Sequence, residues 1–258
     1  MADKKPRIVI TGMGTVNPTG LTVEESWAHI TAGQSGIGPI TLYDSSPLQV
    51  HIAGEVKGFE PAKYMDAKEA RRRDRNIQLA VAATRMAIEH AGLKITEDNA
   101  DDIGCIYGTG VGGLKTYYDS VLILTEGGPR KLPPFCAPST FCDGPSSAIS
   151  IDWGVRGPNF APVSACAAGA DAIGLACQAI KLGQVKAIIA GGTEAPVMIV
   201  GMAAFDRLGA LSHNNDHPQA ACKPFDKNRD GLVMGEGAAT VIVEDLEFAR
   251  ARGARPLA

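Results

Sequence analysis

Short runs of β-branched and aliphatic residues alternate along this chain with longer alanine-rich segments. The runs at 7–13, 103–110 and 187–192 each contain a glycine at which a strand would turn. Further apolar runs lie at 159–163 and 239–245. Continuously apolar runs of this length are typical of strands that are covered on both faces. We therefore predict an α/β fold in which helices pack in layers on a central sheet.

The alanine-rich segments have the spacing of helices. A capping box at 22–25 opens a helix that runs to about residue 32. Residues 65–91 place apolar side chains about 3.6 positions apart and are followed by a glycine, so they predict one long helix. A further helix is predicted over 166–182, and a shorter one follows the strand at 239–245.

Composition sets limits on this picture. The chain has 258 residues, of which 45% are hydrophobic and only 5% aromatic, so its core must consist mainly of Ala, Val, Ile and Leu. A formal net charge of −3 provides no overall attraction to nucleic acid or to a membrane surface. No secretory leader is recognisable, and apolar runs such as 197–205 are too short to cross a bilayer. No linker or repeat marks an internal domain boundary.

The cysteines predict neither a disulfide framework nor a metal site, because they form no C-x-x-C pair. They lie at positions 105, 136, 142, 166, 177 and 222. We expect a reducing, cytoplasmic location and no cofactor or metal. All of them except Cys166 are expected to be buried and unreactive, as free cysteines usually are.

Cys166 has the most informative surroundings. It lies in VSACAAGA (163–170), where a strand-like segment turns into a helix. The positive end of a helix dipole favours a thiolate there, and free backbone N–H groups can stabilise a developing oxyanion. Small neighbours leave room for a substrate carbonyl. These features make Cys166 a candidate nucleophile, and a buried unreactive cysteine is the open alternative.

Two other patterns suggest weaker hypotheses. GTGVGG (108–113) has the G-x-G-x-x-G spacing of a dinucleotide-binding loop. The acidic residue that this motif requires about twenty positions later is missing, because 126–134 is a loop with basic residues. We therefore favour a tight turn that approaches another element over a dinucleotide-dependent oxidoreductase. The histidines, at 29, 51, 90, 213 and 217, lie in segments expected to be solvated, so none is an evident base for Cys166.

A basic run, EARRRDRN, occupies 69–76 directly after Lys68. Such a run is most often a solvated helix face. Its alternative role is to dock an acidic or phosphorylated partner.

Several ordered blocks accompany Cys166 and together carry a family resemblance. They are GTGVGG (108–113), GPRKLPPF (128–135), WGVRGPN (153–159), VSACAAGADAIG (163–174), AGGTEA (190–195), ALS (210–212) and KPFDKNRDGLVMGEGAA (223–239). In this order they resemble the β-ketoacyl-acyl carrier protein synthases, the elongating condensing enzymes of fatty acid and polyketide synthesis. The resemblance implies a thiolase-like αβαβα fold, usually as a homodimer, and makes Cys166 the residue that takes an acyl chain from acyl carrier protein.

The resemblance also implies roles for other positions. Val111 matches an apolar gate at the mouth of the acyl channel, Thr140 and Phe205 match channel-lining positions, and Lys68 and Arg72 match a basic entrance that receives acyl carrier protein.

The family's two catalytic histidines belong to a C-terminal half. We therefore predict that residues 1–258 form the N-terminal half of a β-ketoacyl synthase and that the C-terminal half is absent from the chain. The alternative is a non-catalytic or half-site partner subunit, against which Cys166 argues because such subunits usually lack the nucleophile.

Overall fold

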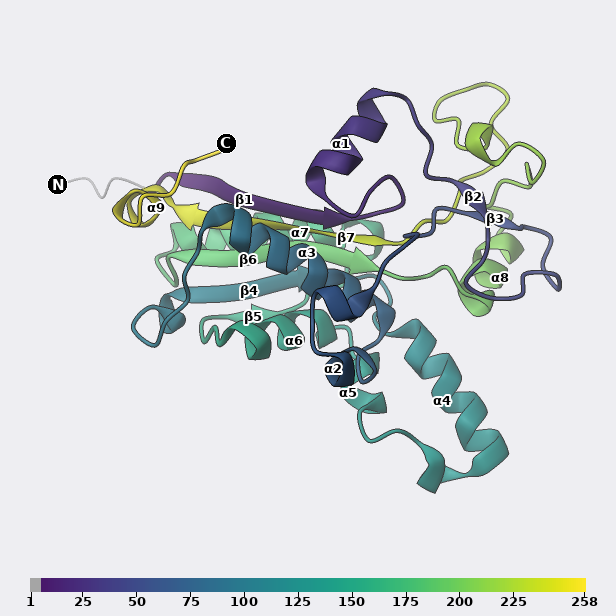
Figure 1. The fold of residues 1–258 in the computed structure, drawn as a ribbon, viewed down its shortest axis with the longest axis horizontal. Helices are drawn as coiled ribbons and strands as arrows, with labels where there is room; N and C mark the ends of the chain where they lie inside the picture. The colour runs from purple at the N-terminus through teal and green to yellow at the C-terminus, as the bar shows by residue number, and fades with distance from the viewer. Residues whose placement is uncertain (1–5) are drawn as a thin grey trace.

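A five-stranded sheet forms the centre of the computed structural model, which describes residues 6–258 (Figure 1). Its strands are β1 (Ile8–Val16), β4 (Ile103–Gly108), β5 (Asn159–Phe160), β6 (Ala187–Glu194) and β7 (Gly237–Asp245). They lie in the order β1-β7-β6-β4-β5. β4 runs parallel to β5 and β6, whereas β7 runs antiparallel to β1 and β6. β2 (Gly38–Pro39) and β3 (Ile52–Ala53) form a separate antiparallel pair.

Helices cover both faces of this sheet. α3 (Arg75–Ala91) and α6 (Gly144–Trp153) pack on one face, and α7 (Ala168–Lys181) packs on the other. Because neighbouring strand residues point to opposite faces, Ile189 of β6 packs in the α3 layer and Ile188 in the α7 layer. Both are fully buried, and each such side chain contributes about 1.5–3 kcal/mol. The predicted layered α/β fold is confirmed.

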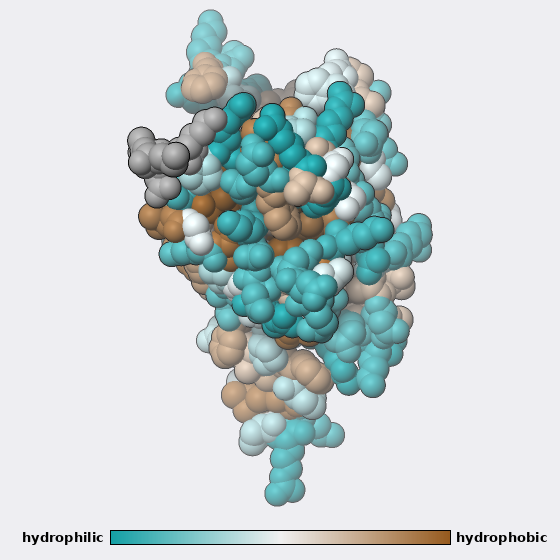
Figure 2. Space-filling model, turned by 90° about the vertical axis from the view of Figure 1, so that its left-hand side faces the viewer, coloured by the Kyte–Doolittle hydropathy of each residue, from teal (hydrophilic) through white to brown (hydrophobic). Residues whose placement is uncertain are grey.

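The remaining α-helices lie around this layered body. They are α1 (Val23–Thr31), α2 (Ala67–Ala70), α4 (Leu114–Gly127), α5 (Cys136–Thr140), α8 (Ile199–Arg207) and α9 (Leu246–Ala251). Residues 114–135, here called the arm, project from the body, whereas α5 lies beside α2 (Figure 1). α4 contains no buried residue, although it carries apolar side chains such as Tyr117 and Leu124. Hydrophobic residues are visible on the projecting part below the body in Figure 2.

The single helix predicted over 65–91 is wrong. The structure has the short α2 and then α3, separated by a loop at 71–74. Asp74 is the reason. Its carboxylate caps α3 by accepting the Asn76 N–H, and it also accepts the Thr116 N–H in the arm. This side chain is only 4% exposed, so the chain leaves the helix where a buried carboxylate can bridge two segments.

Other differences concern the ends of elements. The run at 159–163 forms only the two-residue β5, while β1, β6 and β7 extend beyond the predicted runs. α4, α5, α6 and α8 had no clear sequence signal. None of the helices described between residues 6 and 258 combines the length and apolar character needed to cross a bilayer. The prediction that the chain begins without a secretory leader concerns residues 1–5 in part, and these lie outside the described residues.

Candidate active site

Cys166 lies in a short 3-10 turn, Ala165–Ala167, that leads directly into α7. The helix was predicted to begin at residue 166, but α7 begins two residues later, at Ala168. Ala165 has a φ of 52°, a left-handed conformation that costs a residue with a side chain roughly 1–2 kcal/mol. The Ser164 hydroxyl donates to Asp171 in the first turn of α7. Cys166 is exposed in this turn, which contradicts the alternative of a buried, unreactive cysteine.

Close backbone packing fixes the beginning of α7 over the sheet. A Cβ on Gly108, at the end of β4, would lie 2.2 Å from the Ala168 carbonyl oxygen. A Cβ on Gly192 of β6 would lie 2.9 Å from the Gly169 Cα. The helix start therefore touches the backbone of two neighbouring parallel strands near their carboxyl ends. In open α/β sheets this end of the strands is where functional sites form.

Glu194, the last residue of β6, organises the turn after β4. Its Oε1 accepts the Thr109 hydroxyl at 2.9 Å, and its Oε2 accepts the N–H groups of Gly110 at 2.5 Å and Val111 at 3.2 Å. The Gly112 N–H donates to the Thr109 hydroxyl at 3.1 Å. Burial raises the pKa of Glu194, and these hydrogen bonds oppose that shift. GTGVGG is thus the tight turn that sequence reasoning favoured, whereas the role of Glu194 was missed.

Two of the residues assigned by resemblance lie on or against the turn that follows β4. Val111 is 49% exposed on the turn that Glu194 holds. A Cβ on the preceding Gly110 would lie 3.5 Å from the Ala165 Cα, so this turn packs against the residue before Cys166. The Gly113 N–H donates to the Thr140 carbonyl at 3.2 Å. Val111 thus lies on the turn that packs against the Cys166 turn, and Thr140 contacts the end of the same turn. Their roles as gate and lining residue stay predictions.

Phe205 is placed less directly. It lies on α8 and is 36% exposed. The start of α8 meets the start of α4, because a Cβ on Gly201 would lie 3.6 Å from Leu114 Cδ2. α8 thus begins next to the helix that follows the turn at 109–112, and the channel-lining role of Phe205 stays a prediction.

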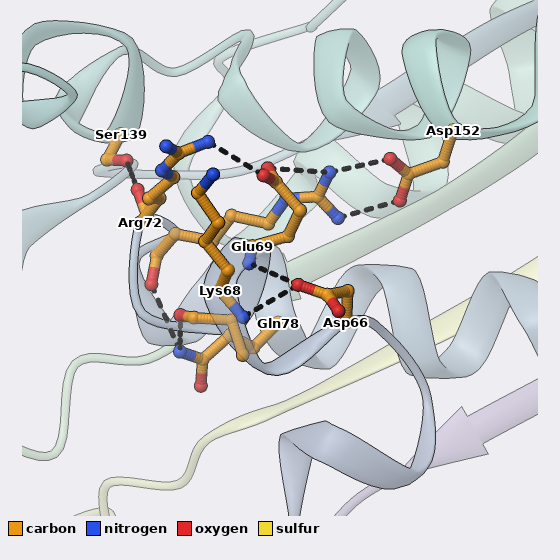
Figure 3. A network of polar contacts seen from close by, with 9 residues as sticks. Asp66, Lys68, Glu69, Arg72, Gln78, Ser139 and Asp152 are labelled. Atoms are coloured by element: carbon orange, nitrogen blue, oxygen red, sulfur yellow. Dashed lines mark hydrogen bonds and ion pairs between the residues drawn. The ribbon is translucent and has the colours of Figure 1, made fainter.

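Lys68 and Arg72 lie on α2 and in the loop after it (Figure 3). Lys68 is exposed. The Arg72 guanidinium donates to Glu69 at 2.9 Å and stacks 4.4 Å from the ring centre of Phe135 in the arm. The Arg72 carbonyl accepts the Ser139 hydroxyl at 2.5 Å. The basic loop is thus attached to the segment that ends at Thr140.

Two further arginines of the basic run are engaged within the fold, whereas Arg71 is exposed. Arg73 forms a two-pronged ion pair with Asp152 of α6, at 2.6 and 2.7 Å. Arg75 does the same with Glu236, at 2.6 Å for both contacts, and the Glu236 side chain is 1% exposed. These arginines join separate segments of the fold, so the prediction of a solvated face is wrong for them. They border a cavity of about 480 Å³ whose lining also includes Arg71, Asp74, Lys115, Thr116, Tyr118 and Met198.

The other titratable candidates lie elsewhere. Cys105 is buried, and burial raises its thiol pKa far above the ordinary value. Cys222 is exposed on the loop after residue 221, so the prediction that it is buried is wrong. His213 pairs with Asp206 at 2.7 Å and, like His29, His90 and His217, is exposed, while His51 is half-buried.

The sequence profile described as Beta-ketoacyl synthase, N-terminal domain, matches residues 5–249. The chain belongs to the β-ketoacyl synthase family. Residues 6–249, which include the Cys166 turn, the Glu194 turn and the basic loop, all lie in the part that matches the family. The predicted family membership is therefore confirmed.

Relatives and solved structures agree with this assignment. The chain is 46% identical over 252 residues to the 3-oxoacyl-[acyl-carrier-protein] synthase 2 of Synechocystis sp., covering 98% of this chain and 61% of that protein. It resembles a β-ketoacyl synthase of Burkholderia phymatum with a TM-score of 0.88 and 33% identity, covering 97% of this chain and 62% of the other.

A third match is a type II PKS acyl-carrier protein in complex with its ketosynthase, with a TM-score of 0.86 and 28% identity. It covers 98% of this chain and 61% of that one. These matches confirm the ketosynthase fold. The chain spans about three fifths of the length of the proteins it matches.

Proposed function

We propose that this chain is the acyl-accepting half of a 3-oxoacyl-acyl carrier protein synthase of fatty acid or polyketide synthesis. The observation that carries the proposal is the exposed Cys166 in a constrained turn at the start of α7, in a chain of the β-ketoacyl synthase family. A thiol of this kind is accessible to a bulky thioester, unlike the buried Cys105. A non-catalytic partner subunit is disfavoured because the nucleophile is present and accessible.

The proposed first step is thioester exchange. The Cys166 thiolate attacks the carbonyl carbon of an acyl chain carried on acyl carrier protein. The bond between that carbon and the carrier sulfur breaks, and the carrier thiolate takes up the proton that Cys166 lost. Backbone N–H groups near the start of α7 are suited to stabilise the oxyanion of the tetrahedral intermediate. No redox change occurs, so the exchange requires no electron carrier.

The proposed second step is a decarboxylative condensation. Malonyl carried on a second acyl carrier protein loses CO₂ to give an enolate, which attacks the acyl carbonyl and releases the Cys166 thiolate. The enolate requires positioned acid–base and electrostatic groups, each of which contributes roughly a hundredfold or more to the rate. The side chains of the histidines at 29, 51, 90 and 213 contact Thr19, Ser45, Met13 and Asp206, none of which belongs to the Cys166 turn. We therefore assign these groups to a C-terminal half and residues 1–258 to the N-terminal half.

Two surfaces support the proposed partners. The exposed Lys68 and the partly exposed Arg72 offer positive charge to an acidic carrier protein, close to the segment that ends at Thr140. For a homodimer, the support is the apolar arm together with the short edge strand β5, whose Phe160 is 41% exposed. The six free thiols fit a reducing compartment, so the cytoplasm is the proposed location.

The test of the first step is acylation of the purified 258-residue chain by acyl-acyl carrier protein, followed by peptide mapping with mass spectrometry. We expect the acyl group on Cys166, and its loss in Cys166→Ser. Cys222→Ser is the matched control, because Cys222 is the other exposed thiol. An adduct that follows Cys222, or spreads over several cysteines, would contradict the proposal. Absence of any acylation would favour the partner-subunit hypothesis.

The test of the second step is malonyl-dependent formation of 3-oxoacyl product. We expect none from residues 1–258 alone. Addition of the C-terminal half of a close relative as a separate polypeptide is expected to restore it. Robust turnover by this chain alone would show that its base lies within these residues and that the assignment of halves is wrong.

A further inference from the structure

Glu194 lies between the turn that carries Val111 and the turn that carries Cys166. We propose that Glu194 is a positioning residue: it holds residues 109–112, here called the gate turn, against the Cys166 turn and so sets which acyl chain lengths reach the thiol. The inference rests on the proposed function, because it concerns the same nucleophile. It assigns no role in proton transfer to the Glu194 carboxylate.

The Glu194 side chain holds several groups of the gate turn at once. Three consecutive residues, Thr109 to Val111, donate to the two oxygens of Glu194. Hydrogen bonds to a carboxylate are about twice as strong as neutral ones. The Thr109 hydroxyl also accepts the Gly112 N–H, which extends the hold to a fourth residue. Loss of both side-chain oxygens would free the whole gate turn, not one contact.

The contact between Glu194 and the gate turn, here called the clamp, lies directly beside the Cys166 turn. A Cβ on Gly110 would lie 2.9 Å from Glu194 Oε2 and 3.5 Å from the Ala165 Cα. Gly110 is therefore packed between the carboxylate and the left-handed residue that precedes Cys166. On its other side the turn continues to Gly113, whose N–H donates to the Thr140 carbonyl. A shift of Val111 must accordingly change the space beside the thiol.

Two substitutions separate positioning from charge. Glu194→Gln keeps an acceptor oxygen for the Gly110 and Val111 N–H groups, while its NH₂ group can donate to the Thr109 hydroxyl, which rotates to accept it. Glu194→Ala removes every acceptor. A positioning residue is therefore rescued by Gln, whereas a residue that acts through its negative charge is not. Glu89→Ala is a matched control, because Glu89 is an exposed glutamate on α3.

The readout is the rate of Cys166 modification as a function of chain length. Straight-chain acyl thioesters from butanoyl to hexadecanoyl, and N-alkyl maleimides of the same lengths, are applied to the 258-residue chain. The quantity compared is the ratio of the rates for the longest and shortest probes. A merely structural role slows all probes alike and leaves this ratio unchanged. Maleimides modify the thiol without any enzymatic function, so failure of the proposed function and failure of the clamp are distinguishable.

We expect Glu194→Ala to change this ratio by about tenfold, the size expected when an ordinary hydrogen bond is lost. Glu194→Gln and Glu89→Ala are expected to keep the ratio of the unmodified chain. An unchanged ratio in Glu194→Ala would overturn the proposal. Equal effects of Ala and Gln would overturn it as well, because the charge would then matter more than the geometry.

Discussion

Gly108 permits a close backbone contact between β4 and the start of α7, and Gly108→Ala tests that packing. The new Cβ would lie 2.2 Å from the carbonyl oxygen and 2.3 Å from the carbonyl carbon of Ala168. Carbon atoms in contact prefer about 3.5–4.0 Å, so the first turn of α7 must move by more than about 1 Å. Both contacting atoms belong to the backbone, and no flexible side chain can yield instead.

The expected cost follows from this displacement. Overpacking of this kind destabilises by about 1–3 kcal/mol, and each kcal/mol lowers the melting temperature of a chain of this size by about 2–4 °C. Thermal unfolding followed by circular dichroism should therefore show a fall of roughly 2–12 °C. The rate of Cys166 alkylation, measured well below the transition, should change too, because the displaced turn carries the thiol.

Gly174→Ala, on the helix α7 that Gly108 contacts, is the matched control. A Cβ there meets nothing within 4 Å, and alanine is favoured over glycine inside a helix by about 1 kcal/mol. This variant should melt at the same or a higher temperature and keep the alkylation rate. If Gly108→Ala matched it in both measurements, the close approach of β4 and α7 would be refuted.

Three further predictions concern the site and its approaches. Val111→Phe should shift the longest accepted acyl chain to shorter lengths in an acylation assay, since overfilling an apolar site costs about 1–3 kcal/mol; an unchanged profile places the gate elsewhere. Lys68→Glu should weaken carrier binding up to about fivefold at low salt and reduce the salt dependence of binding, which titration calorimetry would measure. Lys68 is chosen because its charge can be reversed without loss of the stacking of Arg72 on Phe135. Burial raises the pKa of Glu194 above its ordinary 4.5. Below pH 4.5 the carboxyl group is protonated in both the folded and the unfolded chain, so its ionisation costs no stability. As the pH rises from 4.5 through the raised pKa, ionisation of the buried carboxyl group lowers the stability of the folded chain. The melting temperature of the unmodified chain should therefore fall relative to that of Glu194→Gln as the pH rises. A difference in melting temperature that stays constant with pH would contradict this prediction.

Local patterns sufficed where neighbouring residues decide the structure. The strands β4, β6 and β7 and the helix α7 were predictable because their apolar spacing and flanking glycines lie within each segment. Cys166 was predictable as a candidate from the small residues around it. Its actual conformation was not, because the 3-10 turn and the left-handed Ala165 depend on the packing of α7 against the ends of two strands.

Features that depend on distant partners escaped sequence reasoning. Glu194 contacts Gly110, which is 84 positions away in the sequence, and AGGTEA gives no sign of this pairing. The break before Asp74 depends on a backbone N–H at Thr116 in the arm. Arg73 and Arg75 looked like solvated charges because their partners, Asp152 and Glu236, lie in other elements.

The pairing of the first strand with the last has a consequence for synthesis. Ile8 of β1 lies opposite Asp245 of β7, so the ribosome must add the intervening residues before this pair forms. At about 5–20 residues per second, β1 waits roughly 10–50 s with an unpaired edge. Gly12 and Gly14 lower its tendency to extend into a stable strand on its own. The two glycines that let α3 lie close upon β1 therefore also weaken β1 as a strand while it waits for its partner.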